Sequence, residues 1–247
     1  MLGTFVAIEA EGGTQAEPAV TAAFAAILRV ERLMRPASGG SDVWRISAAR
    51  PGDVVQIDPW TYAVLELAQR LHRESGGVFD PCQPTRPGRC GDLELLAPDR
   101  VACHGAVALD LGGIAKGFAV DRAIDELKRH RCTRGIVNAG GDLRWFGAGT
   151  HTVVLRRDEG ESAQALRIEL TEGALAVSAP RSASSPPEHV GYYLGTTGEA
   201  VAGRWTAVVA PQAALADALA KCAMLSAPPS AAELLARYGA RIVHAGS

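Results

Sequence analysis

The sequence lacks a strong net charge. Its 247 residues contain 25 Lys and Arg against 27 Asp and Glu, which gives a formal net charge of -2. Nucleic acids and anionic membrane surfaces are bound through clustered basic side chains, so this balance predicts neither kind of partner. An acidic ligand must therefore be bound locally, by a small number of positive groups.

Long apolar runs are also missing. No stretch approaches the roughly 20 residues that a membrane-spanning helix needs, so we expect no membrane insertion. The first residues, "MLGTFVAIEA", have neither the basic start nor the long apolar centre of a secretory signal. We therefore expect a cytoplasmic protein.

The cysteines are few and show no paired spacing. The five lie at Cys82, Cys90, Cys103, Cys132 and Cys222, an odd number without the short paired intervals of a zinc site. A protein of the reducing cytoplasm keeps such thiols reduced. We expect them to fill structural positions.

The chain nevertheless has enough apolar residues for a substantial core. At 47% hydrophobic, it can form one large domain or two intimately associated lobes, and we expect a single domain over residues 1–247. The sequence pattern predicts helices at 17–34, 59–75, 115–130, 212–225 and 230–238. Strand-like runs lie at 3–10, 107–111, 134–138, 151–157, 164–170, 173–178, 189–194, 204–210 and 240–245. The strand-like runs are more numerous than a strict alternation of strands and helices would give. We therefore expect the α+β class.

Some boundaries are marked by particular residues. Asp58 can cap the helix at 59–75, Pro59 suits its first position, and Gly76 ends it. The segment 81–99 is rich in Pro, Gly and Arg, which predicts a surface loop. The segment 180–188, "PRSASSPPE", has the composition of a mobile segment.

One stretch carries a candidate anion site. In "DLGGIAKGFAVD" (110–121), glycines lie between the apolar run "VALDL" and an amphipathic helix, and Lys116 stands at the start of that helix. Helix-start amides approached through glycine, with a lysine nearby, suit a phosphate. Alternatively, the glycines only permit a tight turn and Lys116 is solvated. The stretch is neither a Walker A loop nor a GxGxxG motif.

Two further places combine glycine or charge with apolar surroundings. Asn138, Gly140, Gly141 and the Asp after them predict a turn between two strands, which alone indicates no more than a hairpin. Asp217 and Lys221 lie four residues apart on an alanine-rich helix. They could form a surface ion pair, but a buried carboxylate on such a helix needs a cationic partner.

Taken together, these three stretches resemble the ApbE family, the FAD:protein FMN transferases. The family shows a DLGGIAKGYAVD-like stretch, a VNAGGD-like turn and an ADALAT-like helix, and this chain matches them in order at 110–121, 137–142 and 216–220. Weaker similarity lies in "LGT" (2–4), "SGGVFDP" (75–81) and "LAVSA" (175–179). The resemblance covers nearly the whole chain and implies an ApbE-like fold with mixed or antiparallel sheets and packed helices.

The resemblance also implies a ligand and a reaction. Family members bind FAD, and many use Mg²⁺ to transfer FMN to a Ser or Thr of a partner flavoprotein with release of AMP. Carried over by position, the FAD site comprises Val78, Phe79, Asp80, Asp110, Gly112, Gly113, Lys116, Asn138, Gly140 and Gly141. The Gly113 carbonyl and the Asp217 carboxylate are the implied metal ligands, and Asp217 with Lys116 the implied catalytic pair.

The chain departs from the family pattern at several positions. Leu2 replaces a methionine near the flavin, and Met34 stands where an aromatic residue packs on the flavin ring; the polarizable Met can also cover a ring. A family HIIDPRTG-like stretch is eroded, with Leu194 at its aspartate. Lys221 occupies the position of a threonine that helps to hold the metal, and a charged lysine has no lone pair to donate.

Two interpretations therefore remain. The first is an active transferase, or an FAD pyrophosphatase, in which Lys221 extends to solvent and Asp217 holds Mg²⁺. The second is a flavin-binding or partner-binding homologue in which Lys221 pairs with Asp217 and occupies the place of the metal. The second interpretation predicts FAD binding that depends little on Mg²⁺ and weak or absent AMP release.

Overall fold

The main feature of the fold is a six-stranded antiparallel sheet. The structure is a computed structural model that describes residues 2–13, 16–83, 86–155, 165–179 and 205–246. The sheet order is β1-β5-β6-β9-β10-β11. Its strands are β1 (Val6–Glu11), β5 (Arg134–Ala139), β6 (Asp142–Phe146), β9 (Gly173–Ser178), β10 (Trp205–Ala210) and β11 (Arg241–Gly246).

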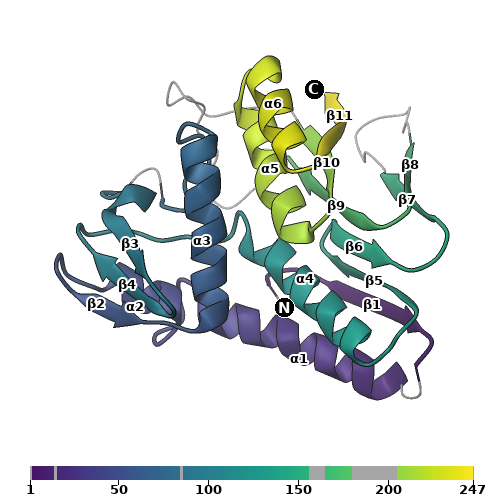
Figure 1. Cartoon of the computed structure of the whole chain (residues 1–247), viewed down its shortest axis with the longest axis horizontal. Coiled ribbons are helices and arrows are strands. Elements are labelled where there is room, and N and C mark those ends of the chain that lie inside the picture. The colour runs from purple at the N-terminus through teal and green to yellow at the C-terminus, as the bar shows by residue number, and fades with distance from the viewer. Residues whose placement is uncertain (1, 14–15, 84–85, 156–164, 180–204, 247) are drawn as a thin grey trace.

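Helices cover one face of this sheet (Figure 1). They are α1 (Ala16–Met34), α4 (Ala115–Arg129), α5 (Ala213–Leu225) and α6 (Pro228–Arg237). Helix α4 packs between α1 and α5, and α5 lies on β9 and β10. Among the described residues, no helix is both long and apolar enough to cross a membrane.

The opposite face of the sheet is covered by an antiparallel pair of strands, the β7–β8 hairpin, formed by β7 (His151–Leu155) and β8 (Leu166–Leu170). Successive side chains of a strand point to opposite faces, so the apolar residues of β6 divide between two clusters. Phe146 belongs to the helix-side core, whereas Leu143 and Trp145 pack with hairpin residues such as Ile168.

A smaller lobe lies beside the sheet (Figure 1). It contains α2 (Asp42–Ser47), α3 (Pro59–Glu74), the 3-10 turn Cys90–Asp92 and a three-stranded sheet of β2 (Val54–Gln56), β4 (Arg100–Cys103) and β3 (Leu93–Leu96).

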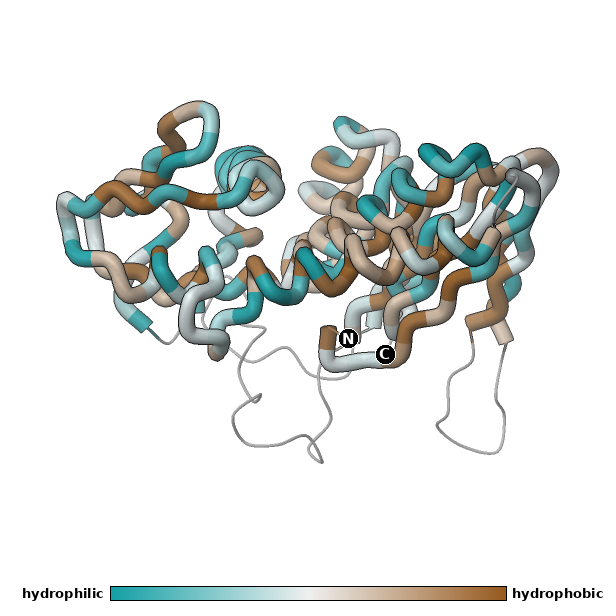
Figure 2. Tube along the Cα trace, turned by 90° about the horizontal axis from the view of Figure 1, so that it is seen from below, coloured by the Kyte–Doolittle hydropathy of each residue, from teal (hydrophilic) through white to brown (hydrophobic). Residues whose placement is uncertain are grey.

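Helix α1 joins the lobes, because it contacts α2 and α3 on one side and β1 and α4 on the other (Figure 2). One buried cluster runs through both lobes, from Leu65 in α3 to Val137 in β5. We propose on this basis that the chain is a single domain.

The α+β class is confirmed, and several predicted elements have the expected ends. The Asp58 side chain accepts a hydrogen bond from the Trp60 amide at 2.9 Å, Pro59 opens α3, and the helix stops before Gly76. The glycine turn after β5 forms the predicted hairpin to β6. Local capping and turn residues defined these boundaries.

Other predicted elements are wrong. The run "VALDL" (107–111) is not a strand: within the described part of the chain, its one ladder contact is an isolated bridge between Leu109 and Cys82. Its backbone is held by other groups: the Asp110 amide donates to the Pro81 carbonyl at 2.7 Å and the Leu109 amide to Ser47 Oγ at 3.1 Å. The run is apolar because it is buried in the core, and burial alone does not specify a strand.

Part of the chain between 81 and 99 is also more regular than expected, because it contains the 3-10 turn and β3. Helix α2 and strands β2 and β4 were not predicted either. The strand expected at 189–194, the mobile segment expected at 180–188 and Leu194 lie outside the described residues.

All five cysteines are buried and unpaired, as predicted. Burial raises the pKa of the Cys90 and Cys222 thiols to about 12. Both therefore remain protonated at neutral pH, which fits structural positions in the core.

Candidate functional site

The start of α4 is built by a short turn. The Asp110 carboxylate accepts a hydrogen bond from the Gly112 amide at 2.8 Å, and the Leu111 carbonyl accepts from the Ala115 amide at 2.8 Å. Neither Gly112 nor Gly113 has a positive φ. Gly113 leaves room for two neighbouring side chains, since a Cβ at this position would lie 3.3 Å from Lys221 Cδ and 3.5 Å from Phe79 Cε2.

Lys221 thus reaches from α5 to the glycine turn, and its ammonium group pairs with Asp217. The Lys221 Nζ contacts Asp217 Oδ1 and lies 3.0 Å from the Asp217 carbonyl oxygen. The two side chains are only 13% and 1% exposed. The sequence-based prediction that these residues pair is confirmed, and the alternative of a lysine extended to solvent is wrong.

The other Asp217 oxygen connects α5 to α4. Asp217 Oδ2 accepts a hydrogen bond from the Gly117 amide at 3.0 Å. A Cβ at Gly117 would lie 2.2 Å from the Ala213 carbonyl oxygen, so only glycine permits this approach of the two helices. Gly117 therefore determines where Asp217 and Lys221 stand relative to the glycine turn.

Lys116 is only partly exposed, and it is paired. Its Nζ lies 3.0 Å from Asp142 Oδ2, and the Asp142 side chain is 2% exposed. Burial, followed by the charge of Asp217, raises the pKa of Asp142 to about 7 against the opposing charges of Lys116 and Lys221. The four residues Lys116, Asp142, Asp217 and Lys221 interact with one another, and we call them the Asp–Lys cluster.

The β5–β6 hairpin holds Asp142 in this cluster. The Asn138 side-chain oxygen accepts a hydrogen bond from the Gly141 amide at 3.0 Å. Gly140 has φ +62°, and a Cβ there would lie 2.3 Å from Thr4 Oγ1, which excludes larger residues. Asn138, Gly140 and Gly141 thus shape the turn; their contact with FAD remains a prediction.

Sequence reasoning missed Asp121, the last residue of the glycine stretch. Its buried carboxylate accepts hydrogen bonds from the Ala213 and Ala214 amides, both at 2.9 Å, and from Arg144 Nη1 at 2.7 Å. It therefore caps α5 from α4. A signal was present, because Asp121 lies four residues after Gly117 and so shares its helix face.

A family model described as the ApbE family matches residues 2–85 and 90–243. The chain belongs to the ApbE family. This match covers the glycine turn, the hairpin and α5, and therefore all four residues of the Asp–Lys cluster. No curated protein matches the sequence.

Solved structures of ApbE proteins have the same fold. The apo form of the Pseudomonas stutzeri flavinyl transferase ApbE is 19% identical, with a TM-score of 0.82 over 98% of this chain and 87% of that chain. The flavin transferase ApbE from Vibrio cholerae is 18% identical, with a TM-score of 0.81 over 97% and 89%. The ApbE protein from Thermotoga maritima is 21% identical, with a TM-score of 0.77 over 98% and 90%.

The residues that ApbE membership implies for FAD are distributed unevenly. Phe79 is buried, and its Cε2 lies 3.5 Å from where a Cβ of Gly113 would stand, so its ring borders the glycine turn. Asp80 holds its own loop, accepting hydrogen bonds from the Cys82 amide at 3.0 Å and the Cys90 amide at 3.3 Å. Asp110 likewise shapes the turn before α4.

The remaining three predicted FAD contacts are apolar. Val78 is half-buried next to Phe79. Leu2 is also half-buried and packs on the main core, whereas Met34, at the end of α1, is only 4% exposed. Their contact with a flavin remains a prediction.

The donor set beside Asp217 does not fit Mg²⁺. Magnesium prefers oxygen ligands, and the position next to the Asp217 carboxylate holds an ammonium group, which has only N–H donors. Within the described ranges, no group of three or more His, Cys, Asp or Glu side chains could hold a metal ion.

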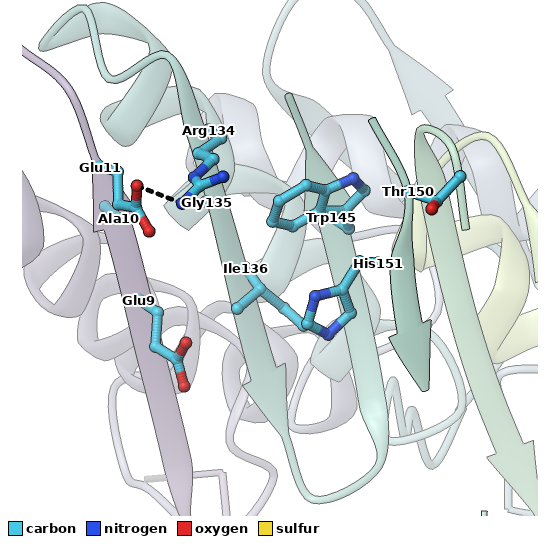
Figure 3. A pocket seen from close by; sticks show the side chains of 9 residues that line it. All are labelled: Glu9, Ala10, Glu11, Arg134, Gly135, Ile136, Trp145, Thr150 and His151. Carbon is cyan, nitrogen blue, oxygen red and sulfur yellow. Dashed lines mark ion pairs between the residues drawn. The ribbon is translucent and has the colours of Figure 1, made fainter. Parts of the chain in front are cut away.

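A separate cavity of about 230 Å³ lies on the hairpin side of the sheet (Figure 3). Its lining includes Glu9, Trp145 and His151, and the rings of the last two stack with centroids 4.9 Å apart. None of the residues predicted for FAD lines this cavity. The cavity and the Asp–Lys cluster are therefore different sites.

The raised pKa of Asp142 predicts a pH effect on stability. Its folded-state value of about 7 lies above the ordinary 3.8, so between these values the folded chain binds more protons than the unfolded chain. The contribution of Asp142 to the free energy of unfolding therefore falls as pH rises from about 4 to about 7. We expect Asp142→Asn to flatten this part of the Tm-against-pH curve, measured by thermal unfolding. The surface variant Asp125→Asn serves as control; an equal slope in wild type and Asp142→Asn would contradict the assignment.

Proposed function

We propose that this chain binds FAD and is an FAD:protein FMN transferase, which passes FMN to a Ser or Thr of an acceptor flavoprotein and releases AMP. The observation that carries the proposal is the Asp–Lys cluster at the glycine turn, where two ammonium groups stand beside the start of α4. Membership in the ApbE family and the likeness to structures described as flavin transferases support it.

The cluster suits the diphosphate of FAD. The Lys116 and Lys221 side chains are 28% and 13% exposed, so a ligand can approach them while they stay paired with Asp142 and Asp217. Positive groups held in place before the reaction stabilise charge that develops on phosphate oxygens.

The proposed reaction exchanges one bond to phosphorus for another. The acceptor oxygen forms a bond to the phosphorus of the FMN half and releases its proton to solvent. The bond from that phosphorus to the bridging oxygen breaks, and AMP leaves with that oxygen. The chain's own part is to hold the diphosphate in line with the acceptor and to neutralise it.

One observation favours a second candidate function. Because Lys221 pairs with Asp217, the chain can be a flavin-binding homologue that holds FAD without turning it over. An FAD pyrophosphatase differs from the transferase only in using water as the acceptor. The identity of the second substrate thus separates these possibilities.

Incubation with FAD and a flavoprotein encoded nearby distinguishes them, with AMP measured by chromatography and acceptor-bound flavin by fluorescence after denaturing electrophoresis. AMP with a fluorescent acceptor supports the transferase, and AMP with free FMN indicates the pyrophosphatase. Bound FAD without AMP indicates the homologue. If FAD does not bind at all, every version of the proposal is wrong.

We infer an acceptor flavoprotein that exposes a Ser or Thr in the same compartment as this chain. The cytoplasmic location expected from the sequence remains a prediction. Fractionation of the native protein tests it, and recovery from the membrane or periplasm would contradict it.

Replacing Lys116 with Ala will weaken FAD binding by about 1–3 kcal/mol, because one charge-assisted contact to the diphosphate is lost. Titration by flavin fluorescence measures this. The control is Lys128→Ala on the same helix, whose ammonium pairs with surface Glu172 at 3.0 Å. Equal affinities in the two variants would place the diphosphate elsewhere.

A further inference from the structure

We propose that the ammonium group of Lys221 takes the place of the divalent cation beside Asp217, so that this chain holds the FAD diphosphate with its own positive charge and without Mg²⁺. The inference rests on the proposed function, since FAD has to be the ligand. It assigns Lys221 a binding role that replaces a metal rather than assists one.

The position of Lys221 supports this exchange. Its stem lies beside Gly113, with Cδ 3.3 Å and Cε 3.5 Å from where a Cβ of Gly113 would stand. Its Nζ contacts both Asp217 Oδ1 and the Asp217 carbonyl, at 3.0 Å from the latter. Lys221 therefore lies with its stem beside Gly113 and its ammonium on Asp217, the two residues that the family resemblance implies as metal ligands.

The charge balance of the cluster also opposes a metal. With both carboxylates ionised, Asp142 and Asp217 carry two negative charges, and Lys116 and Lys221 carry two positive charges. Asp142 and Asp217 are 2% and 1% exposed, so water screens their charges poorly. A divalent cation would enter a buried site that is already neutral, and would be repelled by the ammonium groups.

Lysine is rare in this chain. Only three of the 25 basic residues are lysines, namely Lys116, Lys128 and Lys221, and the rest are arginines. Two of the three belong to the Asp–Lys cluster. An ammonium is a compact point charge, whereas a guanidinium is a broad planar fork, so the two kinds of basic side chain are not interchangeable at this position.

The test measures FAD affinity by flavin fluorescence, once with EDTA and once with excess Mg²⁺. We expect wild-type affinity to change by less than about twofold between the two conditions. Lys221→Met keeps the apolar stem but removes the charge, and we expect it to bind FAD about tenfold more weakly in EDTA. Lys128→Met is the matched control and should bind like the wild type.

Lys221→Thr offers a hydroxyl oxygen beside the Asp217 carboxylate, so its FAD affinity should rise with Mg²⁺. Thermal unfolding without FAD gives an independent measure, since added Mg²⁺ should raise the Tm of Lys221→Thr and leave the wild-type Tm unchanged. Circular dichroism checks that each variant is folded.

The possible results separate the two proposals. Wild-type FAD affinity or Tm that depends strongly on Mg²⁺ would overturn the replacement of the metal. Unchanged FAD affinity of Lys221→Met in EDTA would overturn the binding role of the ammonium. If the wild type binds no FAD under either condition, it is the proposed function that fails, and the Tm series still reports whether Mg²⁺ binds.

Discussion

Asp121→Ala will lower the free energy of unfolding by about 3–5 kcal/mol, the range measured when one partner of a buried ion pair is removed. The substitution leaves the Arg144 guanidinium, only 14% exposed, without its carboxylate. It also removes the acceptor of the Ala213 and Ala214 amides at the start of α5. A buried donor without an acceptor is itself destabilising.

The effect should be specific to position 121. Asp125 lies one turn later on α4 and pairs with Arg122 at 2.8 Å, but its side chain is 38% exposed. Exposed ion pairs contribute about 1 kcal/mol or less, so Asp125→Ala is the matched control. Chemical unfolding in urea measures both variants. Similar losses in the two would show that the carboxylate of Asp121 does not hold α5.

Gly117→Ala will destabilise the chain by about 3 kcal/mol, near the upper end for overpacked cores. Its Cβ would lie 2.2 Å from the Ala213 carbonyl oxygen and 2.7 Å from the Ala214 nitrogen. Both are backbone atoms, so α5 must move as a whole. Alanine favours helix by about 1 kcal/mol over glycine, which offsets only part of the clash.

The same variant should also weaken FAD binding, because moving α5 displaces Asp217 and Lys221 from the glycine turn. Gly91→Ala is the control: nothing lies within 4 Å of its Cβ, and its φ is not positive. Urea unfolding and FAD titration are measured on both proteins. If Gly117→Ala is as stable as the wild type, the two helices are not held in contact at this glycine.

The sequence predicted best what depends on neighbouring residues. Helix α3 follows from Asp58, Pro59 and the glycines after it, and the pair of Asp217 and Lys221 follows from their spacing of four on one helix. In both cases the interacting residues are a few positions apart in the sequence, so the sequence pattern itself predicts that they are close in space.

What the sequence did not predict depends on distant contacts. Asp121 and Ala213 are 92 residues apart, and the sequence near Asp121 does not indicate which helix its carboxylate caps. The pairing of Lys116 with Asp142 was not predicted either, because Asp142 comes from a hairpin whose glycines decide where it stands. The prediction of a strand at 107–111 is wrong for the same reason, because the apolar residues of this run pack in the core without pairing in a sheet.

Helices α4 and α5 are joined twice, one turn apart on each helix. Asp121 binds the amide of Ala213, and Gly117 donates to Asp217 four residues further along α5. The two contacts fix the rotation as well as the distance of α5, so the Asp–Lys cluster forms when the chain folds. A ligand then meets charges that are already in register, and the site is preorganised: little binding energy is spent on arranging it.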